Sequence, residues 1–168
     1  ELRDIRSFFK DANVLIGFEA TWENLKSPRA DVLQISSEFK NDPSNGPFGL
    51  VAFSNGEPLE ESHDVPFPKL TELPASPVVI LSNYAGQGVG LNDFHAFLLR
   101  LNGTSDIFFN AWSADRKATK FFSEFFYTHL ANGLAPGDAY RQALLNLIRI
   151  QEVNHPFSWA QIFHYGIG

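Results

Sequence analysis

The chain of 168 residues contains no cysteine. This absence excludes disulfide bonds, thiolate metal sites and thiol nucleophiles together. No apolar run reaches the roughly 18 residues that a membrane-spanning helix needs, and the mixed-charge start, Glu1-Leu-Arg-Asp-Ile-Arg6, is not a signal peptide. The formal net charge of −6 provides no basic stripe for phosphate contacts, so nucleic acid is not an expected partner. We therefore expect a soluble, cytoplasmic protein.

The residues that are present favour one globular α/β domain over residues 1–168. Hydrophobic residues make up 44% of the chain and aromatic residues 14%, which is enough for a substantial core at this length. Apolar stretches typical of strands alternate with stretches that have helical spacing. This alternation implies βαβ units with right-handed crossovers, and hence a mostly parallel sheet between two layers of helices.

Short apolar runs predict strands at 14–18, 32–37, 48–53, 78–81, 107–112 and 160–165. Helical spacing predicts helices at 1–10, 21–25, around 69–73, at 118–130 and from Pro136 onward. A further helix has Asn92 as its expected cap and Gly103 as its stop. The helix that begins at Pro136 is expected to bury Ala139, Ala143, Leu144, Leu147 and Ile148.

The stretch Pro77–Gly90 organises the chain, because its apolar strand breaks into small residues and glycines. Ligands collect at the carboxyl ends of strands in open α/β sheets, so Ser82, Asn83 and Tyr84 stand where a site is expected. The glycines that follow lack the G-x-G-x-x-G spacing and the Walker lysine. A plain turn is therefore favoured over a nucleotide site.

No motif of metal or serine hydrolase chemistry is present. No two histidines stand at i+3 or i+4, so we expect surface or packing roles for all five, which are His63, His95, His129, His155 and His164. The residues around Ser82 lack the G-x-S-x-G elbow. We expect neither a metal nor a cofactor.

Six segments follow one another in a pattern known from a family. They are 14–21 (VLIGFEAT, on LLGxEAT), 30–39 (ADVLQISSEF, on VLHxATHG), 77–86 (PVVILSNYAG, on LVVLSACETG), 110–119 (NAWSADRKAT, on SLWxVDDxAT), 126–133 (FYTHLANG, on FYxxLxxG) and 155–160 (HPFSWA, on HPYYWAAF). In these segments and their order the chain resembles the CHAT domains, caspase-like peptidase domains found with TPR repeats in bacteria. The resemblance implies a caspase-like three-layer αβα sandwich.

The resemblance also implies where a catalytic dyad would stand. Active members use a histidine that ends one strand to deprotonate a cysteine that ends the next, and the thiolate attacks a peptide carbonyl. The histidine position is Glu38 here, the cysteine position is Tyr84, and the glycine that helps form the oxyanion hole is Phe39. A carboxylate cannot activate a phenol with a pKa of about 10 as a histidine activates a thiol.

We therefore expect a catalytically inactive CHAT-like domain that binds a protein partner or neighbouring parts of its own polypeptide. Its candidate cleft is formed by Ser82, Asn83, Phe39, Trp112 and Asp115. A simpler alternative has Trp112 as a packing residue and Asp115 as a helix cap. A rival hypothesis is a hydrolase that uses Glu38 with the hydroxyl of Ser82 or Tyr84.

One strand of the family is missing from this sequence. In the family a central strand precedes the helix that is predicted here at 1–10. Without it, the strand at 14–18 or the one at 32–37 would have an unpaired edge, which proteins normally cover. We expect an upstream segment, another chain or a rearranged strand to fill this place.

Overall fold

The computed structural model describes residues 5–26, 29–37, 39–40, 50–54, 63–82, 89–110 and 115–166. Its central sheet has the strand order β1-β5-β6-β7. Strands β1 (Val32–Ser36), β5 (Val78–Ser82) and β6 (Asp106–Asn110) are parallel, and β7 (Ile162–Tyr165) is antiparallel to β6. The predicted mostly parallel sheet is therefore confirmed.

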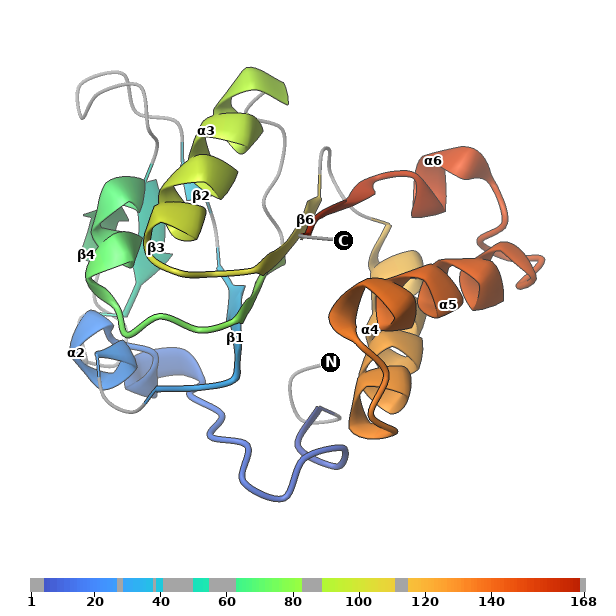
Figure 1. Ribbon diagram of the computed structural model, residues 1–168, viewed down its shortest axis with the longest axis horizontal. Coiled ribbons are helices and arrows are strands. Elements are labelled where there is room, and N and C mark those ends of the chain that lie inside the picture. The colour runs from blue at the N-terminus through green and yellow to red at the C-terminus, as the bar shows by residue number, and fades with distance from the viewer. Residues whose placement is uncertain are drawn as a thin grey trace.

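Alternate side chains of the sheet enter two separate apolar clusters, because successive residues of a strand point to opposite faces. In β5, Val79 and Leu81 belong to one cluster, whereas Val78 and Ile80 contribute to the other. Helix α3 (Val89–Leu101) and the 3₁₀ helix η3 (Phe67–Glu72) cover the first face. Helices α4 (Arg116–Ala131) and α5 (Pro136–Ile148) cover the second. Figure 1 shows these layers, with the orange helices on one side of the sheet and α3 on the other.

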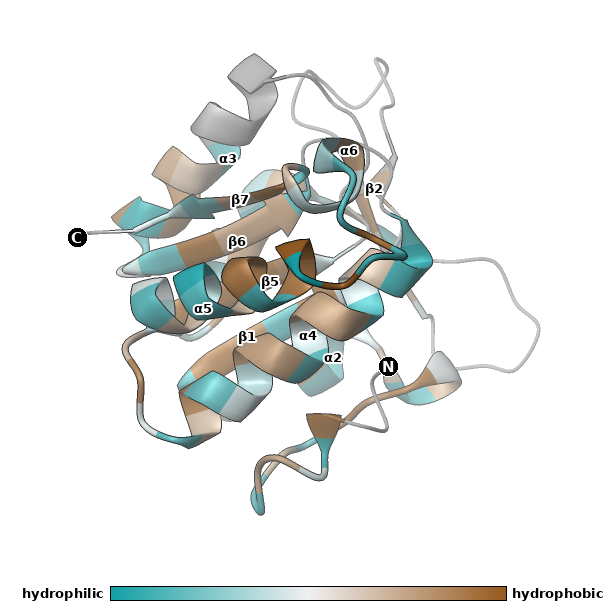
Figure 2. Ribbon diagram, turned by 90° about the vertical axis from the view of Figure 1, so that its right-hand side faces the viewer, coloured by the Kyte–Doolittle hydropathy of each residue, from teal (hydrophilic) through white to brown (hydrophobic). Residues whose placement is uncertain are grey.

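The second face of the sheet is covered by the two long helices α4 and α5. Figure 2 looks onto it, with α4 and α5 in front of the strands and a hydrophobic stretch along β6. Ala139, Ala143 and Leu147 of α5 are fully buried, as predicted, and the two alanines allow the helix to approach its neighbours closely. The prediction for Ile148 is wrong, because its side chain is 38% exposed. Leu144 is half-buried.

Local sequence signals correctly predict the start of α5 and the end of α3. Helix α5 begins at Pro136, and the positive φ of 94° at Gly103 follows the end of α3. A second positive φ, 85° at Gly133, follows α4. The expected cap Asn92 instead lies inside α3, which begins at Val89. Within the described residues, no helix is both long and apolar enough to cross a bilayer.

The amino-terminal part differs from the prediction. Residues 14–18 do not form a strand: Gly17–Glu19 is the 3₁₀ helix η1, and Ile16 and Phe18 are 44% and 56% exposed. Of the helix predicted at 1–10, residues 1–4 lie outside the described residues, and the chain forms turns from Arg6 onward. The helical turn at 21–25 is confirmed as α2 (Trp22–Leu25), capped by Thr21.

A second, antiparallel sheet is only partly predicted by the sequence. It has the order β2-β3-β4, formed by β2 (Phe39–Lys40), β3 (Leu50–Phe53) and β4 (His63–Pro66). Strand β4 is missed because Pro66 and the prolines around the strand indicate a connection. Pro66 is compatible with β4 because this strand is at the edge of its sheet, where a missing N–H costs little. The short helix α6 (Pro156–Trp159) is also not predicted.

Strand β1 is at the edge of the central sheet. Among the described residues, no strand pairs with its outer edge, and only Ile35 of its five residues is fully buried. Residues 14–18 do not fill this place. That a further segment or another chain pairs with β1 remains a prediction.

Candidate functional site

A side-chain hydrogen bond joins the middle of β1 to the carboxyl end of β5. Gln34 of β1 donates from Nε2 to Oγ of Ser82, the last residue of β5, over 3.0 Å. The parallel register places Gln34 beside Ile80, two residues before the Ser36–Ser82 pair. Ser82 is 7% exposed, so this contact lies inside the protein.

Tyr127 of α4 extends this contact to the helical layer. Its hydroxyl donates to Oε1 of Gln34, and its side chain is 2% exposed. The Gln34 amide therefore both accepts and donates, and it connects α4, β1 and β5. We call these three residues, Tyr127, Gln34 and Ser82, the amide relay. A carboxamide has no basic nitrogen, so the relay holds the Ser82 hydroxyl without activating it.

The amino-terminal turns also contact the amide relay. The ring of Phe9 meets Tyr127 edge-on at a centroid distance of 5.7 Å, and the ring of Phe8 stacks on it at 6.4 Å. Phe126, the neighbour of Tyr127 in α4, lies edge-on to it at 5.5 Å. Tyr127 is therefore held by aromatic contacts from two segments of the chain.

A small cavity lies next to the amide relay, between the ends of β5 and β6 and helix α4. Its volume is about 20 Å³, and its polar lining residues are Ser82, Asn110, Thr119, Ser123 and Tyr127. Asn110, the last residue of β6, is 6% exposed, and its Nδ2 is buried without a hydrogen-bond partner among the described residues. This nitrogen is an unpaired donor with almost no accessible surface.

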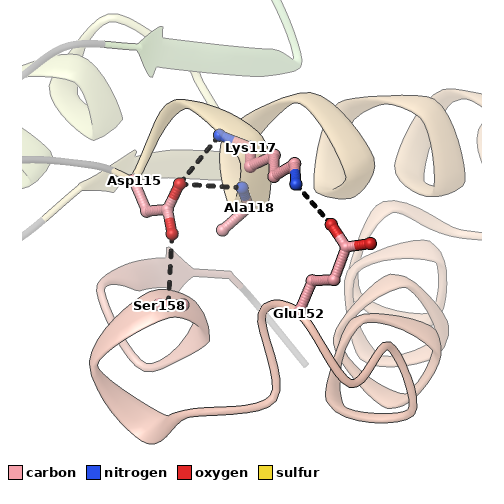
Figure 3. Close-up of polar contacts among 5 residues, drawn as sticks. All are labelled: Asp115, Lys117, Ala118, Glu152 and Ser158. Atoms are coloured by element: carbon pink, nitrogen blue, oxygen red, sulfur yellow. Dashed lines mark hydrogen bonds and ion pairs between the residues drawn. The ribbon is translucent and has the colours of Figure 1, made fainter.

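Asp115 acts as the cap of α4. Its Oδ1 accepts from the backbone N–H of Lys117 at 2.8 Å and of Ala118 at 3.4 Å, and its Oδ2 accepts from Oγ of Ser158 at 3.4 Å (Figure 3). The same turn carries an ion pair between Lys117 and Glu152, and the hydrogen bond to Glu152 raises the pKa of the exposed Lys117 ammonium. Both carboxylate oxygens of Asp115 are thus engaged in holding α4 and α6.

Phe39 lies on the other side of the sheet from the amide relay. It belongs to the cluster formed by η3 and α3, and its ring is 6.2 Å from that of Phe67. The structure therefore does not bring Phe39 together with Ser82. The remaining predicted site residues, Glu38, Asn83, Tyr84 and Trp112, lie outside the described residues.

Two histidines have packing roles, as the sequence predicts. His95 is 3% exposed and stacks on Phe67 at 3.6 Å. His164 stacks on Phe108 at 4.5 Å, and its Nε2 is 2.7 Å from Oδ1 of Asp106. In the part of the chain that the structure describes, no three histidines or carboxylates are grouped as metal ligands would be.

Sequence reasoning misses Gln34, Tyr127 and Asn110. Two of them carry a signal: Gln34 is polar within an apolar strand, and Asn110 ends one. A polar residue inside a buried strand needs a partner, and this requirement points to a hydrogen-bond network. The identity of that partner depends on α4, whose Tyr127 lies 93 positions along the chain from Gln34.

Comparison with known proteins adds one match. A family model described as the CHAT domain matches residues 1–167, which is nearly the whole chain. No curated protein matches the chain.

Proposed function

Since the chain belongs to the CHAT domain family, whose fold is that of caspase-like peptidases, we propose that it is a catalytically inactive member. In this proposal the domain acts by binding a protein partner or a neighbouring part of its own polypeptide. The sheet and its helical layers are retained as a scaffold, and the carboxyl ends of the parallel strands form the binding surface.

The first support is chemical. The chain has no cysteine, so the thiolate of the family's peptidases has no source. By resemblance the nucleophile position is Tyr84 and the base position is Glu38. A tyrosine hydroxyl has a pKa of about 10, and a carboxylate is too weak a base to ionise it near neutral pH.

The observation that carries the proposal is the hydrogen bond from Gln34 to Ser82. Ser82 is the one hydroxyl of the predicted cleft that lies within the described residues, and an amide donor occupies its oxygen. A nucleophilic serine needs a base that accepts its proton, and a glutamine amide does not do so. This arrangement favours a structural role for Ser82.

A peptidase assay tests the absence of activity. We expect the chain to release no more fluorophore from a mixed library of fluorogenic peptides than a buffer blank does. The same result is expected for Glu38→Gln, Ser82→Ala and Tyr84→Phe. Turnover by the original chain that Glu38→Gln abolishes would contradict the proposal and support the hydrolase hypothesis with Glu38 and Ser82 or Tyr84.

A binding experiment tests the interaction role. The chain is used as bait for the other segments of its parent protein and for proteins purified with that parent. Glu38→Arg is expected to weaken the captured complex. The matched control is Glu72→Arg, which makes the same charge change at an exposed residue of η3, before β5 begins. Equal capture by both variants would place binding elsewhere than on the proposed surface.

A further inference from the structure

Helix α5 has apolar side chains on its outer face as well as on its buried face. Ala139, Ala143 and Leu147 are buried in the cluster between α5 and the sheet. Leu145 and Ile148, on the opposite side of the helix, are 40% and 38% exposed. Figure 2, which looks onto this side of the molecule, shows hydrophobic segments in the second half of α5. A surface helix normally has polar residues opposite its buried face, so packing of the core does not explain this outer apolar pair.

Two exposed arginines lie on the same side of α5 as this apolar pair. Arg141, Leu145 and Ile148 stand at i, i+4 and i+7, so their side chains share one face of the helix. Arg149 follows Leu145 by four positions and is also exposed. Each helical residue advances 1.5 Å, so the two arginines are about 12 Å apart along the axis, with the apolar pair between them. We call Arg141, Leu145, Ile148 and Arg149 the α5 outer face.

Neither guanidinium of the α5 outer face is paired within the described part of the chain. No carboxylate there forms an ion pair with Arg141 or Arg149. Glu152, shortly after the helix, is already paired with Lys117. Asp138 is the one carboxylate within α5. The exposed side of the helix therefore has two unpaired arginines against one aspartate, although the net charge of the whole chain is −6.

This local charge decides which kind of partner fits the α5 outer face. A second copy of the chain would bring two further unpaired arginines to the contact and, with Glu152 engaged by Lys117, only one free aspartate. Like charges that face each other across an interface are unfavourable. A helix with carboxylates on both sides of an apolar stripe can instead pair with both arginines while its apolar residues contact Leu145 and Ile148.

From these observations we propose that the α5 outer face docks an acidic amphipathic helix of a partner protein. Helices dock in this way through apolar residues at helical spacing, and complementary charges set their position. Two half-exposed aliphatic residues make a small contact, so the interface belongs to the weak, transient class. The α5 outer face points away from the sheet, so the proposal is independent of the binding surface at the carboxyl ends of the strands.

Two synthetic peptides test this docking surface with ¹⁵N-labelled protein. The acidic probe is a helical peptide with leucines at i, i+4 and i+7 between glutamates, and the basic probe has lysine in place of every glutamate. The acidic probe is expected to shift the backbone amide signals of α5 with a saturable dependence on concentration. The chain has a net charge of −6 and repels this probe overall, so general electrostatic attraction does not produce this result. Salt should weaken the binding, because it screens exposed ion pairs.

Charge reversal separates the α5 outer face from the charge of the whole protein. The double variant Arg141→Glu/Arg149→Glu should bind the acidic probe about tenfold more weakly and should gain saturable binding of the basic probe. The matched control, Lys69→Glu/Arg100→Glu, makes the same charge change at exposed residues of η3 and α3, on the other side of the sheet. It should bind the acidic probe nearly as the original chain does, since distant charges are screened. Leu145→Gln should weaken binding severalfold through lost apolar contact, and thermal unfolding confirms that each variant is folded.

Three outcomes would overturn the proposal. The first is a response to the acidic probe that is unsaturable or lies outside α5, and the second is an equal loss of binding in the two double variants. The third is self-association of the chain in sedimentation velocity that Leu145→Gln abolishes, which would make the α5 outer face an interface between copies. Failure of the proposed function is distinguishable, because peptide turnover would contradict inactivity without changing the binding of either probe.

Discussion

Gln34 donates a 3.0 Å hydrogen bond to Ser82, and this contact joins the middle of β1 to the carboxyl end of β5. The acceptor end of the same amide receives the hydroxyl of Tyr127 from α4. A network with every member paired stabilises one arrangement of its elements, whereas a network with one member removed leaves buried groups unsatisfied. The amide relay therefore makes specific predictions about stability.

Tyr127→Phe should destabilise the protein by about 1–3 kcal/mol, because Oε1 of Gln34 loses its donor in a buried place. Gln34→Leu should lower the free energy of unfolding by a similar amount. The double variant should cost less than the sum of the two, since neither partner is then left unpaired. Urea unfolding of the four proteins measures this coupling. Strictly additive losses would show that the two side chains do not interact.

Asp115→Ala should lower stability by about 0.5–2 kcal/mol, because α4 loses the side chain that caps its first turn. Asp115→Asn should recover most of the loss, since an amide oxygen can still accept from Lys117 N–H and Ala118 N–H. Thermal unfolding followed by circular dichroism measures both. Partner binding per folded molecule should be unchanged in Asp115→Asn. Weaker partner binding by this variant would indicate that Asp115 belongs to the binding surface.

Because Tyr140 is largely buried, we expect the stability of the protein to depend on pH in the alkaline range. Burial raises the pKa of Tyr140 above its ordinary value of 10.0. The unfolded chain therefore releases this proton at lower pH than the folded chain, so stability falls as pH rises from about 10 through the folded-state pKa. Tyr140→Phe should flatten that decline and remove one late step from the absorbance titration of the four tyrosines.

The neutral-pH cost of Tyr140→Phe provides an internal control. The variant loses the 2.8 Å hydrogen bond from the tyrosine hydroxyl to the carbonyl oxygen of Ile162, worth about 1 kcal/mol. Its unfolding midpoint should therefore be slightly lower near pH 7 while its alkaline slope is smaller. An unchanged late titration step in this variant would assign that step to another tyrosine.

We expect the backbone amides on the outer edge of β1 to exchange hydrogen at different rates in the chain alone and in its parent protein. These amides should exchange faster than those of β5, which has a hydrogen-bonded strand on each side. If another segment pairs with β1 in the parent protein, as we propose, the amides of Val32, Gln34 and Ser36 should become protected there, because the amides of Leu33 and Ile35 already face β5. Equal exchange in both settings would contradict the proposed pairing.

The sequence predicted the elements whose signals are local. Buried apolar runs identified β5 and β6, Pro136 marked the start of α5, and Gly103 marked the end of α3. These signals act within one or two turns of chain, so they do not depend on the rest of the fold. The absence of cysteine is likewise a property of the sequence alone, and it excludes thiol chemistry whatever the fold.

Only the tertiary structure decided which elements have neighbours. Residues 14–18 have the composition of a strand but pair with no strand in the structure, and their sequence alone does not show this. Gln34 and Tyr127 are 93 positions apart, and no local pattern specifies that their side chains meet. The same holds for Asn110, whose unpaired amide is recognised only once α4 closes over the end of β6. Composition therefore determined which chemistry is excluded, and packing determined which polar groups are paired.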